Sequence, residues 1–188
     1  MANTDAPRGF IPAFHIAGGA IRFSPVRYDI IDDYATAIYT YDPVTLASNG
    51  TITKAAAGGV VLGIFAGCNY QSSVTREWSF SRTWPAAQSI LPASGYAVAF
   101  IWDDPYIAYL CQHDGTPARA DVGLAYDTVT ALAGDDTYGT SKMELSTTTG
   151  SATDGQFKVI GFPRDDNDYA LANAAAYVLV NESFLKSV

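Results

Sequence analysis

Charged side chains are scarce in this sequence. They make up only 16% of the 188 residues, against about 25% in an average soluble domain. The chain has 11 Lys and Arg against 19 Asp and Glu, which gives a formal net charge of −8. So acidic a chain is expected to have neither nucleic acid nor an anionic membrane as its main partner.

Targeting and membrane-spanning patterns are also missing. Residues 1–9 contain no basic region followed by an apolar one, so no secretory signal is expected. The longest apolar stretches, such as residues 58–68, are too short and too rich in glycine to span a bilayer. Neither end has a lipidation motif. The sequence therefore predicts synthesis in the cytoplasm of the cell that makes the protein.

Cysteine and histidine are rare, with 2 of each. Cys68 and Cys111 lie in apolar, strand-like runs, which favours two buried free thiols over a disulfide or a reactive site. His15 and His113 are too widely spaced to form a zinc pattern with them. We expect no metal, no cofactor and no catalytic cluster.

What the sequence does contain is β-structure around a sizeable core, since 48% of the residues are hydrophobic. The expected strands are 37–41, 44–46, 51–53, 60–70, 77–84, 96–102, 106–112, 156–162 and 177–180. Asn49-Gly50 predicts a tight hairpin, and the acidic turn at 103–105 predicts a second one. The alanine-rich run 170–176 fits either a loop or a short helix. The length predicts a single domain.

The predicted strand over residues 60–70 contains two glycines on one face. If the strand alternates regularly, Gly63 and Gly67 flank Phe65, whereas Ile64 and Cys68 lie on the opposite face. Glycines in a strand allow it to bend or let another backbone approach closely. A curved strand of this kind suits a small β-barrel.

The stretch 77–84 alternates with a period of two. Trp78, Phe80, Arg82 and Trp84 would share one face of a strand. Such a row of rings is either a platform for carbohydrate or part of the core, and we expect core packing.

Acidic pairs recur along the chain, at 32–33, 103–104, 135–136 and 165–166. Neighbouring residues of a strand point to opposite faces, so a sequence pair is not the facing carboxylate pair that a glycosidase needs. We expect turn residues that accept hydrogen bonds from the local backbone. The run that starts at Asp165 does not match a calcium-binding loop, because Ala170 and Ala176 stand where glycine and glutamate are required.

Residues 1–19 lack a clear period and mix glycine and proline with Phe10, Ile11 and Phe14. A segment of this kind either packs along its own domain or serves as an arm that is buried on a partner. Up to residue 28 it carries three arginines against one aspartate, which suggests an arm for an acidic surface. We therefore divide the chain into an arm, 1–19, and a β-barrel domain, 20–188.

Several stretches, taken in order, resemble small virion proteins of tailed bacteriophages. They are 1–3, 6–10, 38–46, 49–52, 55–58, 61–70, 84–85, 99–105 and 112–115. The run Val61–Tyr70 is the most specific of them. Proteins of this kind look like capsid decoration, or cement, proteins.

The resemblance implies an all-β body, a β-barrel or β-tulip, seated on the outside of a DNA-filled head. It also implies an arm that reaches across neighbouring major capsid protein subunits, and homo-oligomers that are often trimers. On this interpretation Arg8 is the charged contact of the arm, and Phe10, Ile11 and Phe14 are its apolar anchors. Packing of Phe10 and Phe14 on the chain's own domain is an equally open alternative.

Two other functions remain as alternatives. A carbohydrate- or receptor-binding module of a tail or fibre would need an exposed aromatic platform that includes Trp78 and Trp84. An enzyme, the least favoured hypothesis, would need carboxylates, or His113 with carboxylates, to converge in a pocket.

Overall fold

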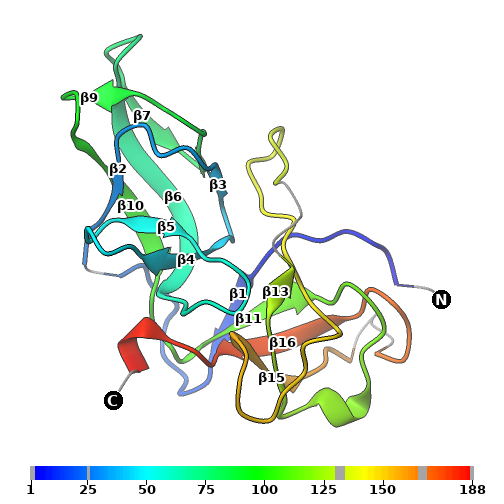
Figure 1. Ribbon diagram of the computed structural model, residues 1–188. Helices are drawn as coiled ribbons and strands as arrows, with labels where there is room; N and C mark the ends of the chain where they lie inside the picture. The colour runs from blue at the N-terminus through cyan, green and yellow to red at the C-terminus, as the bar shows by residue number, and fades with distance from the viewer. Residues whose placement is uncertain (1–2, 25, 130–133, 165–168, 187–188) are drawn as a thin grey trace.

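The computed structural model of the protein describes residues 3–24, 26–129, 134–164 and 169–186. The fold is all-β, as the sequence predicts: in the described ranges the strands form two larger antiparallel sheets and two short ladders, and the helical elements there are two 3-10 turns. Figure 1 shows the larger sheets as two lobes, with β6 and β10 in the upper lobe and β11 and β16 in the lower one.

The lower lobe is built on a five-stranded sheet in the order β1-β11-β16-β15-β12. Its strands are β1 (Ile11–His15), β11 (Ile107–Gln112), β16 (Ala175–Val180), β15 (Phe157–Gly161) and β12 (Ala125–Tyr126). This lobe also contains a short ladder of two strands, β13 (Thr128–Val129) and β14 (Glu144–Leu145). It includes two 3-10 turns as well, η1 (Arg119–Asp121) and η2 (Phe184–Lys186). The 170–176 run is mainly a turn that enters β16, not a helix.

The upper lobe is built on a seven-stranded sheet whose long central strand is β6 (Gly63–Ser72). The main path runs β2 (Tyr28–Ile31), β10 (Tyr96–Trp102), β6, β4 (Pro43–Leu46) and β5 (Ile52–Lys54), while β7 (Trp78–Ser81) and β9 (Ile90–Leu91) also pair with β6. Beside it, β3 (Ile38–Tyr39) pairs with β8 (Thr83–Trp84). The predicted hairpin at Asn49-Gly50 is confirmed as the β4–β5 turn, where Gly50 has a φ of +81°.

No sheet closes into a barrel within the described ranges. The five-stranded sheet ends at β1 on one side and at β12 on the other, and the main path of the larger sheet ends at β2 and β5. The architecture is therefore two open sheets, each of which covers its own core.

The predicted hairpin between 96–102 and 106–112 is wrong. Strands β10 and β11 follow one another in the chain but belong to different sheets. Both edges of β10 are already paired, with β2 and β6, and both edges of β11 are paired, with β1 and β16. The acidic turn at 103–105 therefore carries the chain from one lobe to the other.

Regular alternation along β6 is also wrong. Phe100 lies opposite Gly67, but the next residue of β10, Ile101, lies opposite Phe65, so Ala66 is an extra residue in a β-bulge. The bulge reverses the alternation beyond Ala66, so that Cys68 packs in the upper core together with Phe65, whereas Ile64 packs in the lower core.

The close backbone approach expected at the glycines of β6 is confirmed. A Cβ at Gly67 would lie 2.9 Å from the carbonyl oxygen of Ser81, and one at Gly63 would collide with the carbonyl oxygen of Trp102. Glycine at these two positions lets the neighbouring chain segments approach β6.

Each lobe has its own core of buried apolar side chains. The upper core gathers Ile30, Phe65 and Trp84 among others, and the lower one gathers Phe10, Tyr109 and Phe157 among others. Cys68 and Cys111 lie in the upper and lower cores as buried free thiols, as predicted. Burial raises the pKa of the Cys68 thiol to about 12, so neither cysteine is placed for thiolate chemistry.

Candidate interaction surface

The outer face of the upper sheet carries a continuous row of aromatic rings. Phe80 of β7 lies 5.5 Å from Phe100 of β10 between ring centroids, and Phe23 lies 6.3 Å from Phe100 and 5.2 Å from Trp102. Tyr41 stacks on Trp102 at 5.9 Å with 12° between the ring planes. We call these five residues the aromatic ladder.

The strand pattern explains why these rings meet. Along β10, Ala97, Ala99 and Ile101 are buried, so the alternate residues Phe100 and Trp102 point away from the upper core. Gly67 lies between the neighbouring strands and opposite Phe100 without a side chain of its own. The rings of Phe80 and Phe100 can therefore touch across the central strand.

Much of this face is open to solvent. The exposed fraction is 71% for Phe80, 52% for Phe23, 70% for Trp78 and 57% for Tyr96. Large rings that remain exposed next to one another mark interaction surfaces more often than chance, whereas single exposed apolar residues need no explanation. The outer face of the upper sheet is therefore our first candidate site.

The aromatic row predicted over residues 77–84 is split by the structure. Trp78 and Phe80 are on β7, in the large sheet, but Trp84 is on β8 and is fully buried. The ring of Trp84 packs against Tyr70 at 5.6 Å, and its Nε1–H donates to the carbonyl oxygen of Tyr34 at 3.1 Å. The expectation of core packing is right for Trp84 and wrong for the other two rings.

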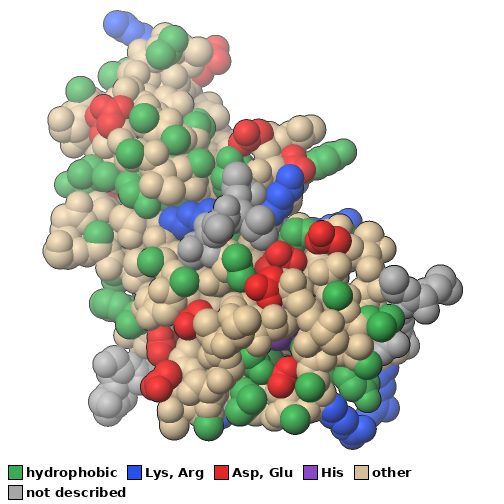
Figure 2. Space-filling model, turned by 45° about the vertical axis from the view of Figure 1, so that its right-hand side comes forward, with side chains coloured by type: hydrophobic (Ala, Val, Ile, Leu, Met, Phe, Trp, Pro, Cys, Tyr) green, Lys and Arg blue, Asp and Glu red, His purple; other side chains and the backbone are tan. Residues whose placement is uncertain are grey.

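A cleft of about 810 Å³ lies where the N-terminal segment passes between the lobes. Figure 2 shows acidic and basic side chains gathered side by side in the middle of the molecule, between its upper and lower parts. The charged side chains that line the cleft are Asp5, Arg8, Arg82, Asp135, Lys142 and Glu144. Tyr41 and Tyr138 line it as well, so the cleft adjoins one end of the aromatic ladder.

Glu144 is the most perturbed of these charged groups. It is only 7% exposed, and its Oε1 atom is buried without a hydrogen-bond partner in the described part of the chain. Burial, together with the negative charges of Asp5 and Asp114, raises the pKa of this carboxyl to about 7. The cleft thus contains a carboxyl group that binds a proton far more readily near neutral pH than an exposed glutamate does.

The predicted arm residues lie against the chain's own lower lobe. Phe10 is completely buried and stacks on Phe157 at 4.0 Å, while Ile11 begins β1 and is half-buried. Phe14 is 41% exposed and meets Tyr177 edge-on, and Arg8 is exposed at the cleft. The four residues are therefore close in the chain but differ in accessibility.

The segment before Phe10 is hydrogen-bonded to the lower lobe, where the Asn3 amide donates to the carbonyl oxygen of Ala172 at 3.1 Å. The Gln112 side chain accepts from the N–H of Ala6 at 3.1 Å and donates to the carbonyl oxygen of Thr4 at 2.9 Å. Gly9 then turns the chain with a φ of +71°, packed too closely against Ser141 to carry a side chain. The segment thus lies on the surface up to Arg8 and enters the core only at Phe10.

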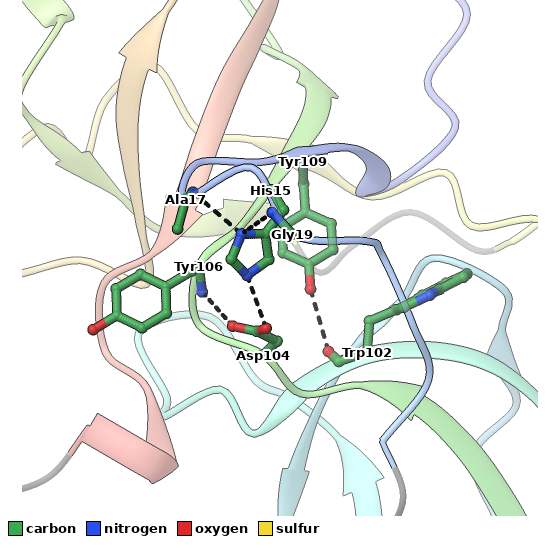
Figure 3. A network of polar contacts seen from close by, with 7 residues as sticks. All are labelled: His15, Ala17, Gly19, Trp102, Asp104, Tyr106 and Tyr109. Atoms are coloured by element: carbon green, nitrogen blue, oxygen red, sulfur yellow. Dashed lines mark hydrogen bonds and ion pairs between the residues drawn. The ribbon is translucent and has the colours of Figure 1, made fainter.

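The surroundings of the two histidines indicate a role in the fold. His15 bonds to Asp104, as Figure 3 shows, and His113 is completely buried with neither ring nitrogen hydrogen-bonded to a described residue. No group of three or more His, Cys, Asp or Glu side chains gathers as a metal site among the described residues. No helix in the described ranges is long and apolar enough to cross a membrane.

Two of the four acidic pairs accept from the local backbone, as predicted. Asp135 accepts from the N–H groups of Thr137 and Tyr138. The pair 103–104 lies in the connection between the lobes, where Asp104 accepts from the N–H of Tyr106 at 2.9 Å. Asp32 instead accepts from the N–H groups of Ile90 and Ser94, which are distant in the sequence, so the prediction is wrong for this pair. The fourth pair, 165–166, and the rejected calcium loop that starts there lie outside the described residues.

Sequence reasoning missed Phe23, Arg82 and Glu144 as site residues. Phe23 lies outside any strand, and Glu144 sits in a Ser- and Thr-rich stretch that reads as a loop. Only the position of these residues in the fold brings them to the ladder or the cleft, and no local pattern indicates it.

A scan against protein-family models finds no match, and comparisons with curated proteins and with solved structures find none either. The resemblance to decoration proteins of tailed phages therefore stays a prediction.

Proposed function

We propose that this chain is a structural virion protein that binds the outside of an assembled phage head and stabilises the lattice of the major capsid protein. The observation that supports it most is the aromatic ladder, in which Phe80 and Phe23 are exposed beside the exposed rings of Trp78 and Tyr96, on a chain with few charges. Such a surface gains free energy when a partner covers it, at about 25 cal/mol for each Å² of apolar area removed from water.

A protein that binds only the assembled lattice stabilises that lattice by mass action. In this proposal the chain acts from the capsid exterior, after synthesis in the host cytoplasm, and carries out no catalytic step. Copies of the chain associate with one another around local symmetry axes, with a trimer as the first expectation.

The N-terminal arm is also part of the proposal: one of its residues anchors the segment in the lower lobe, and others contact the capsid. Phe10 anchors the segment in the chain's own lower core, which leaves residues 3–8 and the exposed face of Phe14 for contact with capsid subunits. Arg8 is then the charged contact of the arm.

Co-sedimentation with expanded heads that lack the protein tests this function. Replacing two exposed rings, in the variant Trp78→Ala/Phe80→Ser, should abolish co-sedimentation. Val122→Ser, which changes an apolar residue that is 45% exposed in the other lobe, should bind like the wild type. If the Trp78→Ala/Phe80→Ser variant binds heads and protects them from heat as well as the wild type does, the outer face of the upper sheet is not the capsid contact.

The arm is best tested with a short deletion. Removing residues 1–7 leaves Phe10 and β1 in place, whereas removing 1–14 takes away part of the core and of the five-stranded sheet. Undiminished head binding by the folded 1–7 deletion would exclude residues 3–7 as a capsid contact, and undiminished binding by Arg8→Gln would exclude the charged contact.

A second candidate function is a carbohydrate- or receptor-binding module of a tail or fibre. Trp78 and Phe80 are exposed two residues apart on β7, opposite the partly exposed polar side chains of Gln71 and Asn69. Exposed rings beside amide groups can stack on sugar rings and hydrogen-bond to hydroxyl groups. A glycan array would support this function if a bound glycan is lost on Trp78→Ala and retained by Val122→Ser.

A further inference from the structure

The cleft between the lobes holds cationic side chains that its acidic residues do not neutralise. Asp135 is already engaged: its Oδ1 accepts from two backbone N–H groups, and its Oδ2 lies 3.7 Å from Lys142 Nζ. Arg8 and Arg82 form no ion pair with any described carboxylate. Two guanidinium groups therefore line the cleft without an ion-pair partner among the described residues, in a chain whose net charge is −8.

The acidic residues of the cleft contribute less negative charge than their number suggests. Lys142 offsets Asp135 at 3.7 Å, and burial of Glu144 raises the pKa of its carboxyl to about 7, which weakens its negative charge near neutral pH. Asp5 is then the acidic residue of the cleft whose negative charge still offsets the positive charges of the two arginines. Charged or titratable groups from several segments surround Glu144. The N-terminal segment contributes Asp5 and Arg8, and the 134–142 segment contributes Asp135 and Lys142. The others are Cys111 of β11, Asp114 just beyond that strand, and Arg82 between β7 and β8.

We propose that this cleft binds an extended, carboxylate-bearing segment of the protein shell, with Arg8 and Arg82 pairing with its acidic side chains and the buried Glu144 carboxyl facing them. The inference rests on the proposed function, for which it names the chemistry of the partner. A guanidinium offers two parallel N–H donors to a carboxylate, which gives geometric specificity as well as attraction.

The dimensions and surroundings of the cleft favour a peptide over nucleic acid. A volume of about 810 Å³ is in the range that accommodates a few side chains. Nucleic acid carries a dense, continuous row of phosphates and needs an extended basic surface. The cleft instead mixes its arginines with Asp5 and Glu144, and the rest of the chain is acidic.

Glu144 gives the proposed site a direction of pH dependence. Below pH 7 its protonated carboxyl is uncharged and can donate a hydrogen bond to an incoming carboxylate. Above pH 7 it adds a negative charge to the cleft and repels that carboxylate. Binding of an acidic segment should therefore weaken as the pH rises from 6 to 8, while the segment itself stays ionised throughout.

Fluorescence polarisation with a labelled hexaglutamate peptide tests the proposal on the full chain. Hexaglutamine and a single-stranded DNA oligonucleotide are the comparison probes. We expect hexaglutamate to bind best and to lose about tenfold in affinity with Arg82→Gln or Arg8→Gln. Arg76→Gln is the matched control, because Arg76 is an exposed arginine in the β6–β7 turn and does not line the cleft.

The variant Glu144→Gln separates a role of this carboxyl in binding from a role in folding. It keeps the size of the side chain but cannot ionise, so the loss of hexaglutamate affinity between pH 6 and 8 should disappear. Thermal melting of each variant confirms that it is folded before its binding is compared.

Equal binding of hexaglutamate and hexaglutamine, an equal effect of Arg76→Gln and Arg82→Gln, or tighter binding of DNA would each overturn the inference. The proposed capsid function is tested separately from the proposed cleft site. If the Arg82→Gln variant still co-sediments with heads, only the cleft is excluded as the contact. If the wild type binds hexaglutamate but not heads, the capsid function is wrong and the cleft remains.

Discussion

His15 donates a hydrogen bond from Nε2 to Asp104 Oδ2 at 3.0 Å, and this bond ties the end of β1 to the turn between the lobes (Figure 3). The Nδ1 atom accepts from the N–H groups of Ala17 at 3.2 Å and Gly19 at 3.3 Å. Because Nδ1 accepts, it carries no proton, so the proton of the neutral ring is on Nε2. The contact is therefore a hydrogen bond from a neutral imidazole to a carboxylate.

Removing either partner should destabilise the protein. We expect His15→Ala and Asp104→Ala to lower the free energy of unfolding by about 1–2 kcal/mol each, since both break partly buried hydrogen bonds. A double-mutant cycle in urea should give a coupling energy of about 0.5–1.5 kcal/mol. Strictly additive losses would show that the two residues stabilise the fold independently.

Phe10 and Phe14 should differ sharply in their effect on stability. Phe10→Ala empties a fully buried site against Phe157 and is expected to cost about 3–5 kcal/mol. Phe14→Ala, at a ring that is 41% exposed, should cost less than about 1 kcal/mol. Urea unfolding measures both, and a small loss for Phe10→Ala would mean that the N-terminal segment does not pack on its own domain in solution.

Two tryptophans six residues apart provide a matched pair for the aromatic surface. Trp84→Ala should cost about 3–5 kcal/mol, because the ring is fully buried and its N–H is hydrogen-bonded. Trp78→Ala should change stability by less than about 0.5 kcal/mol. Acrylamide should quench a larger share of the emission in Trp84→Phe, which keeps the exposed Trp78, than in Trp78→Phe, which keeps the buried Trp84.

Local pattern predicted the longer strands, such as β6, β10, β11, β15 and β16, but it missed β1, β2 and several short strands, and it did not reveal which strands pair. The Asn49-Gly50 turn is a contact between neighbours in sequence, so its two residues define it. The partners of β10 are β2 and β6, which lie about 30 to 70 residues earlier in the chain, and no local signal reveals that β11 pairs elsewhere. The sequence therefore could not show that two open sheets form in place of a barrel.

The candidate sites were found only in part, for the same reason. Arg8 is recognisable as a charged residue in an irregular segment, but Arg82 and Glu144 reach the same cleft from positions 74 and 136 residues away. The β-bulge at Ala66 shifts side chains between faces without any signal in residue type. A period of two across residues 77–84 likewise hides the change of sheet that exposes Trp78 and buries Trp84.

His113 should make the fold sensitive to acid. Its ring is buried between Tyr126, 5.5 Å away, and Phe162, 6.4 Å away, and burial lowers the pKa of the imidazole below 6.5 despite the opposing charges of Asp121 and Asp114. The unfolded chain therefore takes up a proton at this residue at a higher pH than the folded chain does. The free energy of unfolding should fall as the pH drops below 6.5, with a slope of at most about 1.4 kcal/mol per pH unit from this one group.

The variant His113→Phe isolates that contribution, because it keeps an aromatic ring and removes the two buried nitrogens. Urea unfolding at pH 7.5, 6.5 and 5.5 should show a smaller acid loss for the variant than for the wild type. Glu144 acts in the opposite direction, since its raised pKa makes the folded chain bind a proton first, but it is present in both proteins and cancels in the difference. Equal pH dependence in the two proteins would mean that the His113 nitrogens are solvated in the folded state.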